Sequence, residues 1–301
     1  MIRPGNGRVH LGEEFIVFFQ ISASVIDGLL IGFVYGIAAM GLSLIWGVMR
    51  VINLAHGATM ALGMFCIYYL FTDVGVNPYL GLLLVVVLAL IFGFTIYMAS
   101  LHRVIQAGYL YTLLATFAVN MIIIGIGTTV FSTSPRNVDF SLGSIDLGPL
   151  ILQGTRLLAA GASIVMTAAL YLFLYFTRPG KAIRAVSDNR AAAELMGIHS
   201  SQVLALTFGL GTMLAAVAGG LTSTFFPFTI LSGSTYQLKS FVICVLGGLG
   251  HPLGALFGGL ILGGLEGIVP IFMPVSWVPV VEFGLFVLVL VVRPTGLMGA
   301  K

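Results

Sequence analysis

The chain is built from long apolar stretches that carry almost no charge. Of its 301 residues, 59% are hydrophobic and 8% are charged, whereas ordinary soluble domains carry roughly 25% charged residues. Several windows exceed the roughly 18 uncharged residues that span a bilayer as a helix. The alternating polar and apolar strands of a membrane barrel are not seen. The sequence therefore predicts an all-α, polytopic transmembrane helical bundle, formed as a single domain by residues 1–301.

The apolar windows predict about eight membrane spans. We expect helices near residues 18–48, 56–71, 79–100, 109–131, 157–177, 203–226, 237–250, 253–271 and 276–292. These are eight or nine windows, and the long first one is taken as a single crossing. Because each span needs about 20 residues, no room is left for a large soluble domain. Any ATPase or receptor that works with this chain must be a separate protein.

Lysine and arginine residues near the span ends predict the orientation, because such residues favour the cytoplasmic side. If the polar loop 178–202 is cytoplasmic, eight of the 13 basic residues lie inside and five lie outside or near the outside. The N-terminus is then expected outside and the C-terminus in the cytoplasm. The net charge of +3 is explained by this arrangement at the membrane, and no nucleic-acid partner is expected.

Ionisable residues inside the spans are few. Asp27 and Glu282 are expected near the outer ends of their spans, where interfacial water solvates them. Glu266 is expected deeper and is the better candidate for a polar contact within the bundle. Since the three carboxylates look scattered along the sequence, they do not form the facing pairs that a proton-coupled carrier needs.

Two polar or glycine-rich interruptions divide the apolar windows. The segment INLAHG, residues 52–57, either caps a helix end or forms a helix break that lines a cavity. The segment GGLGHP, residues 247–252, predicts a helix end or a re-entrant turn. Together with the deep carboxylate, these interruptions give the candidate translocation residues Asn53, His56, Gly57, Gly248, Gly250 and Glu266.

The sequence contains no signal for catalysis or a metal centre. A single histidine without further ligands at suitable spacing is a poor metal site, and the motifs of phosphate-binding loops, zinc proteases, serine hydrolases and paired-cysteine sites are missing. Cys66 and Cys244 lie in apolar runs, which is typical of buried thiols. We therefore expect a non-enzymatic protein that binds neither metal nor cofactor.

The loop 178–202 is the only long polar segment between apolar windows. On a helical wheel, residues 184–196 predict one amphipathic helix that Gly197 ends. Two opposite-charge pairs four residues apart, Arg184 with Asp188 and Arg190 with Glu194, support it. Its apolar face would consist of Ala185, Val186, Ala192, Ala193 and Met196. From the residues alone, this face could lie on the membrane or dock in a partner's groove.

Four segments carry a family resemblance: residues 41–63, 184–221, 245–266 and 293–299. They resemble the permeases of ATP-binding-cassette (ABC) importers for branched-chain amino acids, a family that also includes permeases for urea and short amides. Such importers have a cytoplasmic coupling loop of the form EAA-x3-G. Ala191, Ala192, Ala193 and Gly197 match this form, with Ala191 in the place of the glutamate.

The resemblance implies a permease subunit in the inner membrane of a bacterium or archaeon. It implies a second, similar permease, two cytoplasmic ATPases that bind ATP and Mg, and an outside solute-binding protein as partners. The expected function is import of branched-chain or related small amino acids by ATP-driven alternating access. The alternatives are a urea or short-amide importer permease of the same family, an ATP-independent channel and a secondary transporter. The expected ATPase-coupling residues are Arg184, Asp188, Arg190, Ala192, Ala193, Glu194, Met196 and Gly197.

Overall fold

The computed structural model describes residues 7–147 and 150–299. Its elements, in chain order, are α1 (Gly7–Met49), α2 (His56–Thr72), α3 (Pro78–Ile96), the π-helix η1 (Tyr97–Leu101), α4 (His102–Val104), α5 (Tyr109–Phe131), β1 (Ser144–Leu147), β2 (Leu150–Gln153), α6 (Gly154–Phe176), α7 (Arg178–Asp188), α8 (Arg190–Leu195), α9 (Ser200–Thr222), α10 (Ser232–Gly247), α11 (Pro252–Phe272), the 3-10 helix η2 (Val275–Trp277) and α12 (Val278–Val292). The predicted helical bundle is confirmed.

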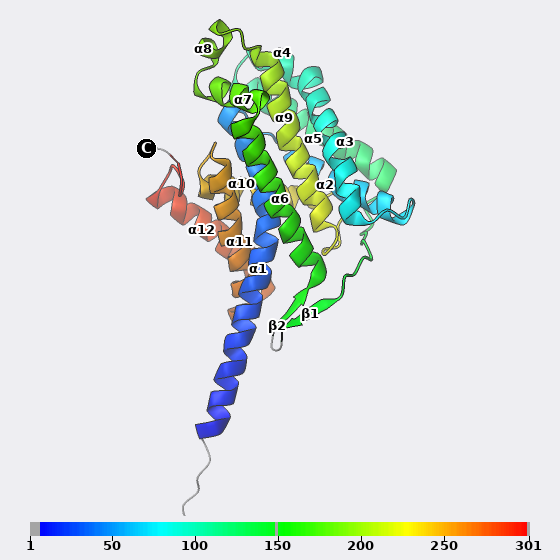
Figure 1. Cartoon of the computed structure of the whole chain (residues 1–301), viewed down its shortest axis with the longest axis vertical. Helices are drawn as coiled ribbons and strands as arrows, with labels where there is room; N and C mark the ends of the chain where they lie inside the picture. Colours follow the sequence, from blue (N-terminus) through cyan, green and yellow to red (C-terminus); the bar gives the residue numbers. More distant parts are fainter. Residues whose placement is uncertain (1–6, 148–149, 300–301) are drawn as a thin grey trace, which may run out of the picture.

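Helix α1 forms the axis of the bundle (Figure 1). It is continuous over 43 residues, so the long first window is one unbroken helix. It packs against α6, α9, α10 and α11, and the most apolar part of its span, within 19–49, is 89% buried. A helix that is apolar all round in this way belongs in the interior of a membrane protein.

Every predicted window is helical, but the helices differ in length. Among the described residues, seven helices are long and apolar enough to cross a membrane: 19–49, 78–104, 109–131, 154–176, 200–222, 252–272 and 275–292. The other two, α2 and α10, have 17 and 16 residues. At 1.5 Å per residue they are about 25 Å long, which is less than the roughly 30 Å hydrocarbon core.

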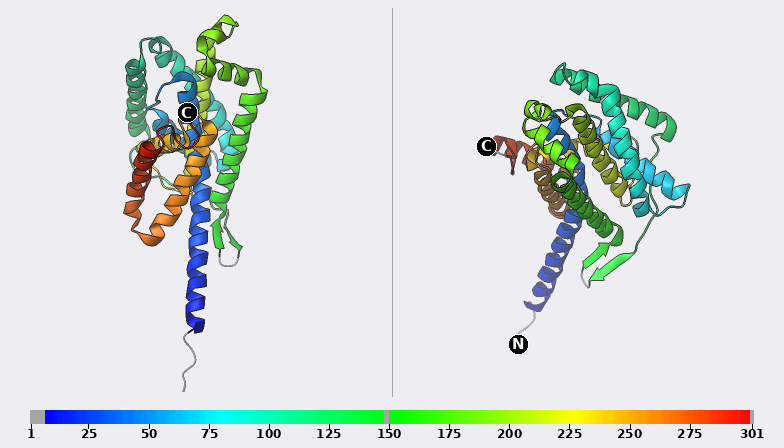
Figure 2. Two further views of the ribbon diagram at one scale, coloured as in Figure 1. Left: turned by 90° about the vertical axis from the view of Figure 1, so that its left-hand side faces the viewer. Right: turned by 45° about the horizontal axis from the view of Figure 1, so that its top comes forward.

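In the part of the chain that the structure describes, five of these nine helices precede α7 and four follow α8. Eight membrane crossings would return both ends of a chain to the same side, so the predicted number of eight does not fit the predicted placement of the termini on opposite sides. Figure 2 shows α7 and α8 at one end of the molecule and the β-hairpin at the other.

A seam of glycines joins α1 to α11. Gly28 and Gly32 on α1 face Gly259, Gly263 and Gly267 on α11, and a Cβ at Gly32 would lie 2.7 Å from the carbonyl oxygen of Gly259. Small residues at such spacing let membrane helices approach closely, because packing drives their association. The glycines thus bring the backbones of α1 and α11 into direct contact along this seam.

The hairpin end of the bundle carries one partly exposed ion pair. Strands β1 and β2 pair antiparallel, with Ser144 opposite Gln153, and α6 follows directly. Near the start of α6, Arg156 pairs with Asp27 of α1. Asp27 was expected to be solvated at the interface. It is partly exposed, but it also has a protein partner, because α6 starts beside it.

Candidate functional site

The predicted single helix over residues 184–196 is wrong. The segment forms two helices, α7 and α8, which meet at Asn189 in an extended conformation with φ −153° and ψ 104°. The Asn189 side chain accepts a hydrogen bond from the backbone N–H of Ala192 at 3.0 Å. Asparagine is among the best N-cap residues, so it starts a new helix here instead of continuing the first.

Helix α7 is fastened to the membrane bundle. Ile183 and Val186 are buried against the core, and Ser187 Oγ donates a hydrogen bond to the carbonyl oxygen of Gly47, near the end of α1, at 2.9 Å. The predicted pairing of Arg184 with Asp188 is not found, because Arg184 turns towards α6. There its Nε donates to the carbonyl oxygen of Leu174 at 3.1 Å.

Helix α8 contains the second predicted pair. Arg190 Nε lies 3.1 Å from Glu194 Oε1, and the Ser200 hydroxyl also donates a hydrogen bond to this carboxylate. The pKa of the Glu194 carboxyl group lies below its ordinary value, mainly because of the hydrogen bond from Ser200 and to a smaller extent because of the one from Arg190. These contacts tie α8 to the start of α9.

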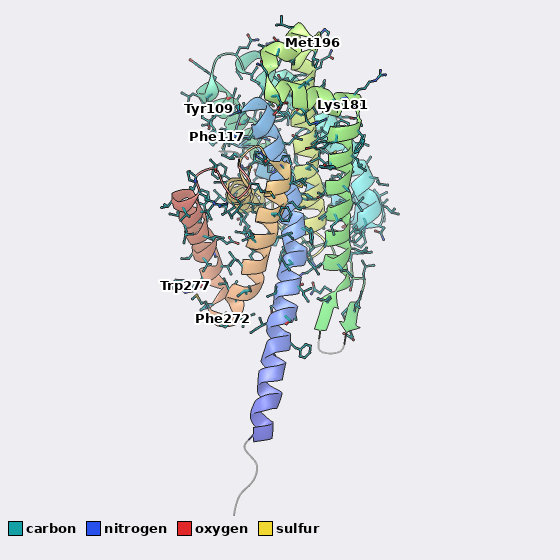
Figure 3. All side chains as sticks on the ribbon, turned by 60° about the vertical axis from the view of Figure 1, so that its left-hand side comes forward. Tyr109, Phe117, Lys181, Met196, Phe272 and Trp277 are labelled. Atoms are coloured by element: carbon teal, nitrogen blue, oxygen red, sulfur yellow. The ribbon has the colours of Figure 1, made fainter. Side chains whose placement is uncertain are left out.

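The tip of this segment presents different side chains from those expected. Ala193 is buried within the chain, whereas Leu195 and Met196 are 89% and 83% exposed. Figure 3 shows Met196 at an extremity of the molecule, far from Phe272 and Trp277. We name Leu195 and Met196 the α8 tip. The alanine face is therefore split, with Ala193 turned inward and Ala192 exposed.

Gly197 ends α8, as predicted. Its φ is +82°, in the left-handed region where glycine is tolerated without strain. The N–H groups of Gly197 and Ile198 donate to the carbonyl oxygens of Glu194 and Ala193, respectively. This double hydrogen bond is a Schellman motif, and it fixes the direction in which the chain leaves the tip.

The GGLGHP interruption lies at the same end of the bundle. Helix α10 ends at Gly247 and α11 begins at Pro252, so the predicted helix end is confirmed. Gly248 and Gly250 both have positive φ, and Gly250 packs on Gly47. The C-terminal segment closes this turn, with backbone hydrogen bonds from Leu297 and Met298 to the carbonyl oxygens of Leu246 and Gly247.

The INLAHG interruption lies deep in the bundle and leads into α2. Asn53 and His56 are fully buried. His56 Nε2 lies 2.9 Å from the carbonyl oxygen of Ala38 on α1, and Asn53 Oδ1 accepts from the N–H of Ala55 at 3.0 Å. Asn53 therefore caps the local turn, whereas His56 bonds to another helix. Asn53 Nδ2 and His56 Nδ1 are buried without a hydrogen-bond partner among the described residues.

Gln237 of α10 connects this interruption to the rest of the site. Its Oε1 accepts a hydrogen bond from the N–H of Gly57 at 2.6 Å, and its Nε2 donates to the carbonyl oxygen of Asn53 at 3.3 Å. Gly57 and Gly233 also touch through their backbones. The first turns of α2 and α10, the two short helices, thus meet inside the bundle.

Two residues further along α10, Lys239 contacts two of the carboxylates. It forms an ion pair with Glu266 of α11 and lies 3.4 Å from Glu282 Oε1 of α12. Its Nζ also lies 5.1 Å from the centre of the Tyr35 ring. We name Lys239, Glu266 and Glu282 the α10 charge cluster. The expectation that the acidic residues are scattered is wrong, and so is the solvated position expected for Glu282, which is buried.

The structure divides the candidate translocation residues among three places. Asn53, His56 and Gly57 lie at the start of α2, Glu266 lies in the α10 charge cluster, and Gly248 and Gly250 lie in the turn after α10. Helix α10 connects all three. The sequence analysis missed Gln237 and Lys239 as contributors. Lys239 lies inside an apolar window of the sequence, and this position indicates an interior ion pair, because a buried ammonium group requires a carboxylate partner.

Long spanning helices, two short helices that meet inside the bundle, and a structured polar segment at one end define a polytopic helical membrane protein. The family model for the permease component of branched-chain amino acid transport systems matches residues 24–290, and the chain belongs to this family. The resemblance carried by the four sequence segments is therefore confirmed. The chain is a transport subunit of the ABC-permease type and not an enzyme.

The branched-chain amino acid permeases among the relatives match over nearly the full length, and a ribose permease matches over about half. The high-affinity branched-chain amino acid permease LivH of Salmonella typhimurium is 28% identical over 311 residues, which cover 96% of this chain and 98% of the relative. The probable LivH of Methanocaldococcus jannaschii is 28% identical over 96% of this chain and 93% of its own. The ribose import permease RbsC of Escherichia coli is 29% identical over 54% of each chain.

Proposed function

We propose that the chain imports branched-chain or related small amino acids by ATP-driven alternating access. It works with a second permease, two ATPases that bind ATP and Mg, and an outside solute-binding protein. The single domain of residues 1–301 spans the inner membrane of a bacterium or archaeon, with the N-terminus outside and the α7–α8 segment and C-terminus in the cytoplasm. The names of the full-length relatives support this cargo.

The α8 tip is the proposed ATPase contact. Two large apolar side chains that stand 89% and 83% exposed outside the long apolar helices are typical of a protein-binding surface. Ala192, Arg190 and Glu194 border the tip, and Gly197 sets its direction. The observation that carries the proposal is the path from this segment to the core: Ser187 bonds to Gly47, and Gly47 packs on Gly250 after α10.

Movement along this path would reach the interior break at Asn53 and His56. Asn53 Nδ2 is a hydrogen-bond donor, and a histidine whose Nε2 donates to a carbonyl offers Nδ1 as an acceptor in its neutral form. An amino acid carries a carboxylate that accepts and an ammonium group that donates. The two unpartnered atoms therefore suit a passing amino acid once α2 and α10 separate.

The test is uptake by the purified complex in liposomes, with and without ATP and binding protein. We expect leucine uptake that depends on ATP. The double variant Leu195→Asp and Met196→Asp should lower this uptake at least about tenfold, because burying both apolar side chains against the ATPase contributes more than about 1.4 kcal/mol to docking. Gln202→Ala, an exposed change at the same end, serves as the control. Normal uptake by the double variant would refute the α8 tip as the contact.

The same assay separates the alternatives. Urea, a short amide and ribose compete with labelled leucine only if the path accepts them. Uptake that follows a proton gradient without ATP would identify a secondary transporter, for which the α10 charge cluster would be the coupling site. Flux without either energy source would identify a channel.

A further inference from the structure

A second feature at the α7 end is a cavity of about 580 Å³ between α1, α6, α7 and the start of α11. Most of its wall is apolar and includes Leu44, Leu170, Leu174 and Phe257. Polar side chains occur on α7 and on the turn before α11, namely Arg184, Ser187 and His251. The cavity thus has an apolar body and a basic edge.

Arg184 is held at this edge in a defined position. Its guanidinium group lies 4.3 Å above the centre of the Tyr175 ring, and its Nε is bonded to the carbonyl oxygen of Leu174. A guanidinium group has five N–H donors, so the remaining donors are available to a ligand. No carboxylate pairs with Arg184 within the described residues 7–147 and 150–299.

Two more basic residues extend the edge along α7. Arg178 and Lys181 are exposed and form no ion pair within the part of the chain that the structure describes. Figure 3 shows Lys181 projecting outward from α7. Helix α7 follows the last residues of α6, a predicted span, so this basic stripe lies where the bundle meets the membrane surface.

We infer that this cavity binds one anionic phospholipid. The phosphate of the head group pairs with Arg184 and His251 at the edge, and an acyl chain fills the apolar body between α1, α6 and α11. Basic pockets between membrane helices at the cytoplasmic surface bind anionic head groups, and this cavity joins such a pocket to a hydrocarbon-lined space. The inference rests on the proposed function only in taking the α7 end as cytoplasmic.

Charge selects this occupant over a protein. A second permease packed here would have to bury Arg184 without a carboxylate of this chain to pair it, and an isolated buried charge is strongly unfavourable. A zwitterionic lipid fills the apolar body equally well but brings a compensating ammonium group to the basic edge. An anionic lipid satisfies both parts of the cavity.

The test is native mass spectrometry of the intact complex, purified with its partner subunits, in the presence of phosphatidylglycerol or phosphatidylcholine with identical acyl chains. We expect one tightly bound phosphatidylglycerol per chain, with an affinity roughly tenfold higher than that of phosphatidylcholine, as for a hydrogen bond to a charged group. Arg184→Gln should remove this preference, and Arg184→Lys should retain part of it. Leu253→Trp, at an exposed wall position, should weaken both lipids.

Arg103→Gln is the matched control. Arg103 is exposed and adjoins His102, which contacts Ser201 at the start of α9. The Arg103→Gln substitution therefore removes a charge from the same end of the bundle but not from the cavity. Equal affinity for both lipids, or an equal loss in the two glutamine variants, would refute the site. Displacement of phosphatidylglycerol by inorganic phosphate alone, or exclusion of lipid by a partner subunit, would do the same. None of these readouts requires transport, so failure here is distinct from failure of the proposed function.

Discussion

Two clusters of acidic and basic side chains in this permease have similar composition and opposite surroundings. In α8, the Arg190 and Glu194 side chains are 41% and 48% exposed. In the α10 charge cluster, the side chains of Lys239, Glu266 and Glu282 are 18%, 14% and 5% exposed. Water can replace a lost partner in the first cluster but not in the second. The difference indicates that the interior cluster contributes more to holding helices together than the exposed pair of α8 does.

The largest expected effect is that of Lys239→Met. The change leaves Glu266 and Glu282 without the cation that pairs with both, and breaking a buried ion pair costs about 3–5 kcal/mol. We expect a large fall in the thermal unfolding temperature of the purified protein, measured by differential scanning fluorimetry in detergent.

The matched control is the triple variant Lys239→Met, Glu266→Gln and Glu282→Gln. It removes the charges together, so most of the lost stability should return, because the cost comes from unpaired charge. If the triple variant is as unstable as Lys239→Met, the cluster does not act through its charges.

A smaller effect is expected from Gln237→Ala. Two backbone groups, the N–H of Gly57 and the carbonyl of Asn53, lose their partner. Both hydrogen bonds are only partly buried, so the cost stays below the about 1–3 kcal/mol of a fully buried unsatisfied group. Proteolysis of the purified protein near residues 50–57 should become faster. The exposed neighbour Thr235→Ala is the control, and equal rates in both variants would show that the link between α2 and α10 does not stabilise this segment.

The smallest effect is expected from Arg190→Gln. Its partner Glu194 is exposed and also receives the Ser200 hydrogen bond, so the unfolding temperature should match that of the unchanged protein within error. A fall comparable to that of Lys239→Met would remove the contrast between the two clusters.

Much of the fold could be predicted from the sequence because membrane spans are long and apolar. All nine windows became helices, and the 109–131 window agrees with α5 at both ends. Hydropathy does not reveal, however, how deep in the bundle a helix begins or ends. The meeting of α2 and α10 inside the bundle depends on contacts between Gly57 and Gly233, which are distant in sequence.

The candidate site was predicted less completely, because its residues depend on tertiary neighbours. A helical wheel assumes one continuous helix, and Asn189 breaks it by capping α8. The wheel therefore assigned Ala193 to the contact face and omitted Leu195. Glu266 is predictable as a polar group inside the bundle, but its ion pair with Lys239 joins two separate helices and depends on their tertiary packing. A search for carboxylate partners of every lysine in an apolar window would have joined them.

The glycine seam between α1 and α11 has a consequence for how this family can vary. A Cβ at Gly32 meets backbone atoms of α11, not the flexible end of a side chain. No exchange of a neighbouring side chain can make room for it, so second-site suppressors in the opposing helix are not available. We therefore expect relatives that keep this helix contact to retain small residues where the backbones of α1 and α11 meet.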